Sequence, residues 1–256
     1  MSTKLKLQIA SDLHIEYDND EFVDPLTLIT PSADVLILAG DIGSFYKYDQ
    51  LYNFISVIAP HFSHVLYIPG NHEFYVPPKY SPKSYNELIS IMDRLNDSVK
   101  NLTVLNRRSV QIGDLCIAGA TLWSDIKCEL PKFIVRIHGM DTRTYRNNHI
   151  LDSNYIKDMV GYCKDHNLRL LCVTHHPPTY DVLKVSTSKK RDKFVSLYAS
   201  SMDDLLVSDN MFGWVCGHVH SNFDFVTDGG CRVMGNQMGK PKDNIMDYSK
   251  TFVIEC

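Results

Sequence analysis

Short apolar runs along the chain predict β-strands. The clearest is Val35–Ala39, five apolar residues that end at Gly40 and Asp41. A run of this kind is typical of a parallel strand covered on both faces. In open α/β sheets, ligands bind at the carboxyl ends of such strands. The other predicted strands of this first group are Leu5–Ala10, Val65–Ile68, Leu168–Thr174 and Phe212–Cys216.

Apolar residues at helical spacing lie between these strands and predict helices that cover the sheets. The second predicted helix begins with a capping box, in which Ser84 is followed three residues later by Glu87. The predicted helices are Tyr48–Ala59, Ser84–Leu95, Tyr155–His166 and Phe194–Val207.

Beyond residue 100 the pattern changes to short strands joined by tight turns. The runs Leu102–Leu105, Ser109–Ile112 and Leu115–Ala120 predict antiparallel hairpins that begin a second sheet. No repeat or linker divides the chain, so we expect a single domain over residues 1–256. The remaining strands predicted for the second sheet are Phe223–Val226, Cys231–Met234 and Thr251–Ile254.

Two segments have no regular pattern. Residues 128–151 predict either a flap over a site or a solvated loop. Residues 184–193 are rich in Lys and Arg, and a solvated loop is favoured there over a role in steering phosphates.

Composition narrows the function. The 256-residue chain is 44% hydrophobic, enough for a sizeable core, and its net charge of −4 disfavours nucleic acid as a partner. Seven cysteines without a CxxC pair predict buried reduced thiols. The chain enters its first strand without the apolar core of a signal peptide, and no apolar run could span a bilayer, so we expect a cytoplasmic protein with no membrane partner. No pattern specifies an oligomeric state.

The strands of the first group all end at residue types that bind metals. Asp12 and His14 are two residues apart on an extended segment, so their side chains point the same way. Clustering many such groups without a metal would leave them competing for partners, so the pattern predicts a metal site in which Asp41 bridges two ions. The strand-end residues are Asp12, His14, Asp41, Asn71, His72, His175, His176, His218 and His220.

These motifs resemble those of the calcineurin-like metallophosphoesterases, in the order of that family. The matching motifs are Asp12-x-His14, Gly40-Asp41, Gly70-Asn71-His72-Glu73, His175 and Gly217-His218-x-His220. Further motifs resemble a bacterial-type subgroup of small metallophosphoesterases, namely Thr121-Leu122-Trp123, Thr174-His175-His176-Pro177 and Asn236-x-x-Gly239-x-Pro241. One position departs from the pattern, because Ser44 stands where many members carry a supporting Asp.

The resemblance implies an α/β sandwich of two packed mixed β-sheets flanked by helices, in four layers. It also implies two divalent metal ions. Asp12, His14, Asp41 and His220 would hold one ion, and Asp41, Asn71, His175 and His218 would hold the other. His176 would lie behind the ligands or contact the substrate. Mixed His and carboxylate ligands suit Mn, Fe, Zn or Co.

The implied activity is hydrolysis of a small phosphomonoester or phosphodiester by a hydroxide that bridges the two metals. His72 is expected to protonate the leaving oxygen, and Arg143 or Arg146 to clamp a phosphoryl oxygen. Two alternatives stay open. A non-catalytic interaction module of the same fold is disfavoured by the complete ligand set, and a metal-dependent nuclease by the acidic charge balance.

Overall fold

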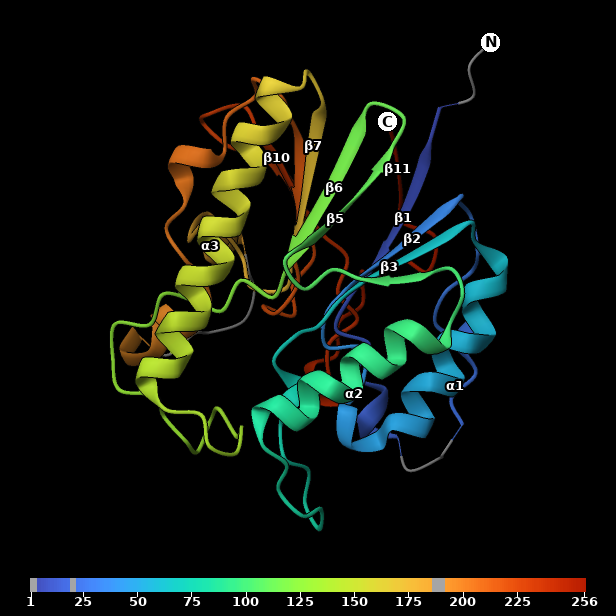
Figure 1. Ribbon diagram of the computed structural model, residues 1–256, viewed down its shortest axis with the longest axis vertical. Coiled ribbons are helices and arrows are strands. Elements are labelled where there is room, and N and C mark those ends of the chain that lie inside the picture. The colour runs from blue at the N-terminus through green and yellow to red at the C-terminus, as the bar shows by residue number, and fades with distance from the viewer. Residues whose placement is uncertain (1–3, 19–21, 186–191) are drawn as a thin grey trace.

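Two β-sheets pack face to face between helices (Figure 1). The computed structural model describes residues 4–18, 22–185 and 192–256. The first sheet has its strands in the order β11-β1-β2-β3-β4 and the second in the order β5-β6-β7-β8-β10-β9. Both sheets are mixed, which confirms the predicted fold class. The strands are β1 (Lys6–Ala10), β2 (Val35–Ala39), β3 (His64–Ile68), β4 (Leu102–Val104), β5 (Arg108–Ile112), β6 (Leu115–Ala120), β7 (Arg169–Thr174), β8 (Met211–Val215), β9 (Phe223–Val226), β10 (Arg232–Gly235) and β11 (Val253–Glu255).

Strand pairing corrects two sequence predictions. The runs 102–105 and 251–254 were expected in the second sheet, but β4 pairs with β3 in parallel and β11 pairs with β1 antiparallel, both in the first sheet. The predicted hairpin is present between β5 and β6. Local turn chemistry specifies a hairpin, whereas edge strands such as β4 and β11 join a sheet through partners distant in sequence.

The helices form the outer layers. Helices α1 (Tyr48–Ile58) and α2 (Tyr85–Ser98) cover the first sheet, and α3 (Thr142–Asp165) covers the second (Figure 1). A short helix, α4 (Asp181–Val185), follows β7. The capping box of α2 is present as predicted, with reciprocal hydrogen bonds between Ser84 and Glu87.

Two helix predictions were wrong in extent. Helix α3 begins at Thr142 rather than Tyr155, because the Asp141 side chain accepts a hydrogen bond from the Thr144 N–H at 2.7 Å and caps the first turn. Residues 142–151 are therefore helical and not part of an irregular flap. The segment 194–207 contains only 3-10 turns, and Phe194 has a non-helical φ of −120°. Residues 186–191, within the predicted basic loop, lie outside the described residues.

Three apolar layers hold the sandwich together, and they follow from side-chain alternation along the strands. Ile9, Ile37 and Leu66 of the first sheet face Leu171 and Val215 of the second, and this cluster joins the two sheets. The opposite faces of the strands pack under α1 and α2 in one cluster and under α3 in another. The shared middle layer supports a single domain, which stays a prediction.

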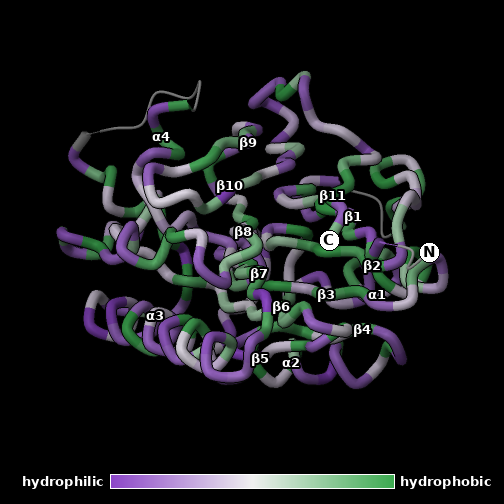
Figure 2. The backbone as a smooth tube through the Cα atoms, turned by 90° about the horizontal axis from the view of Figure 1, so that it is seen from above, coloured by the Kyte–Doolittle hydropathy of each residue, from purple (hydrophilic) through white to green (hydrophobic). Residues whose placement is uncertain are grey.

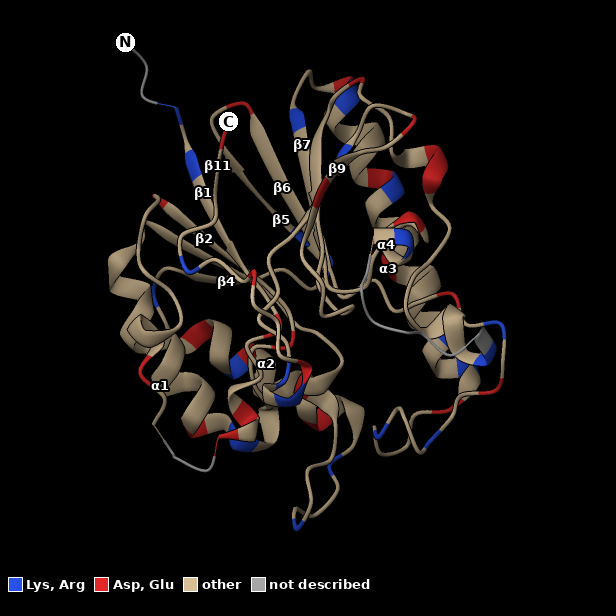
Figure 3. Ribbon diagram, turned by 180° about the vertical axis from the view of Figure 1, so that it is seen from behind, with Lys and Arg blue, Asp and Glu red and all other residues tan. Residues whose placement is uncertain are grey.

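Polarity is distributed as these layers require. Figure 2 shows hydrophobic stretches on the central strands of both sheets. Figure 3 shows Lys, Arg, Asp and Glu mainly on the helices and connecting segments, with few on the strands. All seven cysteines are unpaired; five of them are buried as predicted, and Cys128 and Cys256 are partly exposed. None of the helices in the described part of the chain is long and apolar enough to cross a membrane.

Candidate metal centre

The predicted ligands lie together at the carboxyl ends of β1, β2, β3, β7 and β8. Several of them follow their strand in a left-handed backbone conformation, which is uncommon for residues other than glycine. The φ angles are 53° at Asp12, 51° at His14, 53° at Asp41, 74° at His218 and 49° at His220. Such strained positions cluster where the surrounding structure fixes a side chain for function.

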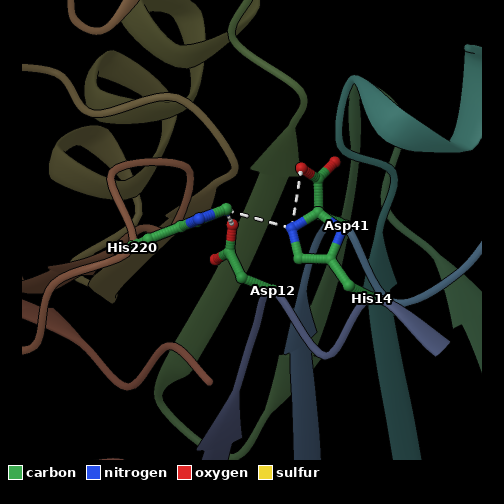
Figure 4. Close-up of side chains that lie close together, drawn as sticks. All are labelled: Asp12, His14, Asp41 and His220. Atoms are coloured by element: carbon green, nitrogen blue, oxygen red, sulfur yellow. Dashed lines mark hydrogen bonds and ion pairs between the residues drawn. The ribbon is translucent and has the colours of Figure 1, made fainter. Parts of the chain in front are cut away.

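Asp12, His14, Asp41 and His220 form one group of converging side chains (Figure 4). His220 Nε2 lies 3.0 Å from His14 Nε2 and 3.3 Å from Asp12 Oδ1. His14 Nε2 lies 3.7 Å from Asp41 Oδ2. The Ser11 hydroxyl donates to Asp12 Oδ2 at 2.6 Å and holds that carboxylate in place. Two carboxylates and two imidazoles thus present their ligand atoms to one point.

Asp41, His175 and His218 form the second group. His175 Nε2 lies 3.4 Å from Asp41 Oδ1 and 3.3 Å from His218 Nδ1. Asn71 belongs with this group, because its amide oxygen lies 3.0 Å from His175 Nε2. Asp41 is the member common to both groups, with one carboxylate oxygen toward each. A bridging residue would need this position, and the bridging role of Asp41 stays a prediction.

The ring nitrogen of each histidine that points away from its group has a partner of its own. When a carboxylate or carbonyl binds one imidazole nitrogen, it fixes the tautomer and leaves the other nitrogen free to bind a metal. The outward contacts are His14 Nδ1 to Glu16 Oε1 at 2.9 Å, His220 Nδ1 to Asp243 Oδ2 at 2.5 Å, His175 Nδ1 to the Ala39 carbonyl at 3.0 Å and His218 Nε2 to the Leu197 carbonyl at 3.1 Å.

The charges of the site favour a cation at its centre. Burial disfavours ionisation of Asp41, but the neighbouring His175 and His72 hold its pKa well below the usual range. Burial opposes protonation of His175 and His220, yet the adjacent Asp41 and Asp12 carboxylates raise the pKa of each to about 9. A field that holds protons this strongly also suits divalent cations. The mixed nitrogen and oxygen donors therefore fit metal ions.

Sequence reasoning assigned no role to Glu73, which supports Asp41 from behind. Its carboxylate accepts hydrogen bonds from the Asp41 N–H at 3.1 Å, the Ile42 N–H at 2.8 Å, the Gly70 N–H at 2.8 Å and the Tyr67 hydroxyl at 2.7 Å. Burial and the Asp41 charge raise the pKa of Glu73 to about 8. These contacts lock together the turns after β2 and β3.

Two glycines permit the close approach of these turns. A Cβ on Gly70 would lie 2.2 Å from Asp41 Oδ1. A Cβ on Gly40, whose φ is +88°, would lie 2.4 Å from His175 Nδ1. Only glycine fits at either position, since both the space and the backbone conformation at Gly40 exclude a side chain.

His72 lies beside the ligands and lines the adjacent pocket. Its backbone N–H donates to Asp41 Oδ1 at 2.8 Å, and its Nδ1 lies 3.1 Å from Glu16 Oε1. Burial lowers the pKa of His72, while Asp41 and Glu16 oppose that shift. Burial also disfavours the ionised form of Glu16, but hydrogen bonds from His14 and His72 lower its pKa to about 2.

The pocket in front of the ligands has a volume of about 770 Å³. Phe133, Tyr75 and Tyr198 supply aromatic surface, and Arg136 and Lys240 supply positive charge. The Arg136 guanidinium lies 5.6 Å above the Tyr75 ring. A cavity of this size accepts an organic group as well as a phosphate.

Arg143 and Arg146 do not join this pocket, which corrects the predicted phosphate clamp. Both lie on the first turns of α3 and line a separate pocket. Arg146 Nε donates to the Ile126 carbonyl at 3.1 Å. The prediction took residues 128–151 as irregular, either a flap or a solvated loop, whereas Arg143 and Arg146 lie on a helix that begins at Thr142. Arg136, in the same stretch of sequence, takes the place expected of them.

His176 lies behind the metal-ligand groups, as one sequence interpretation expected. It is buried, and its ring centroid lies 4.1 Å from that of His218. Burial and the neighbouring His175 lower the pKa of His176 to about 3, so this ring is neutral. Ser44, the departure from the family pattern, is buried and its hydroxyl accepts the Tyr46 N–H at 3.2 Å.

Residues 236–243 contact β1 and two of the candidate ligands. In the sequence this segment was noted only because it resembles a motif of the family subgroup. The Asn236 side chain donates to the Ile9 carbonyl at 2.7 Å, and the Gly239 N–H donates to the Asp12 carbonyl at 2.9 Å. The Asp243 carboxylate contacts Nδ1 of His220. A lone Asp in a polar segment gave no signal of that contact.

Comparison with known proteins identifies the class. The sequence model of the calcineurin-like phosphoesterases matches residues 5–222, so the chain belongs to this family. The match extends from β1 through the Gly217–His220 motif and covers every residue of the two metal-ligand groups. The family and the fold support a phosphoesterase activity in general terms.

Individual relatives are distant in sequence. An uncharacterized protein of Acanthamoeba polyphaga mimivirus is 24% identical over 91% of this chain and 90% of its own length. The solved structure of phosphopantetheinyl hydrolase from Mycobacterium tuberculosis is similar with a TM-score of 0.74 at 15% identity, covering 100% of this chain and 97% of that one. A dimetal phosphatase from Danio rerio is similar with a TM-score of 0.54 at 11% identity, covering 90% and 86%. These similarities show the shared fold.

Proposed function

We propose that this chain is a phosphoric ester hydrolase that uses two divalent metal ions and acts on small phosphomonoesters or phosphodiesters. The observation that carries the proposal is the state of the four imidazoles. Each has one ring nitrogen in contact with an oxygen outside its ligand group and the other turned toward the ligand atoms of that group. Four histidines ordered in this way are characteristic of metal ligands.

In this proposal Asp12, His14, Asp41 and His220 hold one ion. Asp41, Asn71, His175 and His218 hold the other, and the Asp41 carboxylate is shared. When bound, two such ions polarise phosphoryl oxygens and lower the pKa of water. The mixed donors favour Mn, Fe, Zn or Co over Mg or Ca.

The protein's own groups complete the site. His72 is proposed to protonate the leaving oxygen, because it lines the pocket beside Asp41 without belonging to either ligand group. Arg136 and Lys240 are proposed to bind the negative charge of the ester, and Tyr75 and Tyr198 to contact its organic part. His176 is proposed to support the His218 ring from behind.

The test begins with protein stripped of metal and reloaded separately with Mn, Fe, Zn or Co. We expect at least one reloaded form to hydrolyse p-nitrophenyl phosphate, bis(p-nitrophenyl) phosphate or a cyclic nucleotide, and the stripped protein to be inactive. Asp41→Asn purified in the same way controls for contaminating phosphatases. Two bound ions per chain without turnover of any of these esters would contradict the proposal.

A further inference from the structure

Glu16 lies between His14, a proposed metal ligand, and His72, the proposed proton donor. It lies in the 3-10 turn Ile15–Tyr17 that follows His14, and its side chain is only 11% exposed. A single oxygen, Oε1, lies 2.9 Å from His14 Nδ1 and 3.1 Å from His72 Nδ1. One carboxylate oxygen can accept both hydrogen bonds because it has two lone pairs.

We propose that Glu16 is a positioning residue that orients a metal ligand and the proton donor together through this one oxygen. The inference rests on the proposed function for the roles of His14 and His72. The hydrogen bonds of Glu16 with His14 and His72 are present in the structure and do not depend on which reaction the protein catalyses. Neither the family motif nor the sequence pattern assigned a role to this residue.

The consequence for each ring follows from imidazole chemistry. If Nδ1 carries the proton that Glu16 accepts, Nε2 is the remaining ring nitrogen. In His14 that nitrogen lies 3.0 Å from His220 Nε2, within the first metal-ligand group. His72 can give a proton from Nε2 to a leaving group only when both of its ring nitrogens are protonated, and the Glu16 carboxylate, which accepts from Nδ1–H, stabilises that imidazolium. Glu16 therefore keeps the Nδ1 proton in place in both residues.

The arrangement also ties the two rings to each other. Their centroids are 4.6 Å apart and their planes are nearly perpendicular, at 79°. The Lys47 ammonium donates to the Glu16 backbone carbonyl at 2.8 Å and fixes the turn while leaving the carboxylate to the histidines. A shift of Glu16 would therefore disturb metal binding and proton donation at once.

Among the described residues, the Glu16 carboxylate has hydrogen-bond partners only in His14 and His72, and these three side chains converge as a group of their own. Its second oxygen, Oε2, is buried and has no hydrogen-bond partner among the described residues. A buried carboxylate oxygen without a partner is costly, so Oε2 itself adds no stability. Glu16→Gln keeps the side-chain volume and one acceptor oxygen, and its melting temperature, measured beside that of the wild type, separates a change in ring orientation from a loss of fold.

The decisive measurement is the tautomer of His14 and His72 by ¹⁵N NMR of metal-free protein, so that it does not depend on activity. We expect Nδ1–H in both rings of the wild type and a shift of His72 toward Nε2–H in Glu16→Ala. Glu16→Gln should be intermediate, because its amide oxygen can still accept. Identical tautomers in wild type and both variants would overturn the proposal, and the Gln variant keeps the test open if the Ala variant does not fold.

Kinetics of the metal-loaded protein give the second readout. We expect Glu16→Ala to lower kcat on an alkyl phosphate by about 10–100-fold, the range seen when a partner of a metal-bound histidine is removed, with a smaller change in KM. Glu255→Gln, an exposed acid on β11, is the matched control and should leave kcat unchanged. If the wild type hydrolyses no ester, the proposed function fails, and the NMR result still decides the role of Glu16.

Discussion

The two sheets contribute to the candidate metal centre in different ways. The first sheet supplies both carboxylates and the amide through Asp12, Asp41 and Asn71, whereas the second supplies only imidazoles. Backbone hydrogen bonds join the ends of β1 and β2, including the Asp12 N–H to the Gly40 carbonyl at 2.9 Å. One ligand group is thus built mainly within the first sheet, and the other is divided between the sheets.

The two sheets therefore supply different kinds of ligand: the first supplies the charged groups and the second supplies imidazoles. The first sheet carries the negative charge that attracts cations, and the second sheet would complete the coordination of bound ions with imidazole nitrogens. Loss of the shared Asp41 carboxylate should therefore weaken binding of both ions, while loss of a second-sheet histidine should mainly affect one. The following predictions test this comparison.

Asp41→Asn should cause the largest loss, because Asp41 belongs to both groups. We expect a fall in kcat/KM of about 10⁴-fold, or roughly 5–6 kcal/mol of transition-state stabilisation. Metal analysis should find fewer than two ions per chain. Full occupancy with normal turnover would exclude a bridging role for this carboxylate.

His72→Ala should lose less, and the loss should depend on the leaving group. Removal of a general acid costs about 10²- to 10⁴-fold in rate. The rate should fall strongly for an alkyl ester, because its alkoxide leaving group needs a proton. It should fall only slightly for a p-nitrophenyl ester. The ratio of kcat/KM for the two esters, with metal content measured alongside, checks this prediction.

His176→Ala provides the matched second-sheet variant, since His176 also follows a predicted ligand directly. We expect it to affect both esters equally and weakly, because its ring packs behind His218. Equal losses on the two esters in His72→Ala, with metals retained, would assign His72 a positioning role instead.

His175→Ala and His220→Ala compare the two groups directly. Each leaves three ligands, but the His220 variant keeps both Asp12 and Asp41, whereas the His175 variant keeps only Asp41 in its group. We expect at least a 100-fold loss of activity in each, exceeding the cost of removing an outer partner. Titration with metal should show that the affected ion binds more weakly in His175→Ala than the affected ion does in His220→Ala. Equal affinities would contradict the division of charge between the sheets.

Arg136→Ala should have the smallest effect, an increase in KM of about three- to tenfold, because an exposed charge contributes of order 1 kcal/mol to binding. Arg143→Ala is its control on α3 and should leave KM unchanged, since Arg143 lines a different pocket. A larger effect of Arg143→Ala than of Arg136→Ala would restore the original prediction for residues 128–151.

The sequence by itself determined which strands end at the candidate ligands and which residues those candidates are. A buried strand has a fixed alternation, and its polar terminus must lie at the sheet edge, so Asp12, Asp41, Asn71 and His175 could be located from local pattern alone. The capping box of α2 was visible for the same reason, since both partners lie within one turn.

Only the tertiary structure decided which sheet receives β4 and β11 and which side chains contact the candidate ligands from outside the site. Glu16, Glu73 and Asp243 contact partners up to 56 residues away in sequence, as in the 3.1 Å contact between Glu16 and His72 and those of Glu73 with the β2 turn. Such contacts have no sequence period, because they arise when separate strand ends are packed together. The same packing turned Arg136 toward the pocket and carried Arg143 and Arg146 away from it.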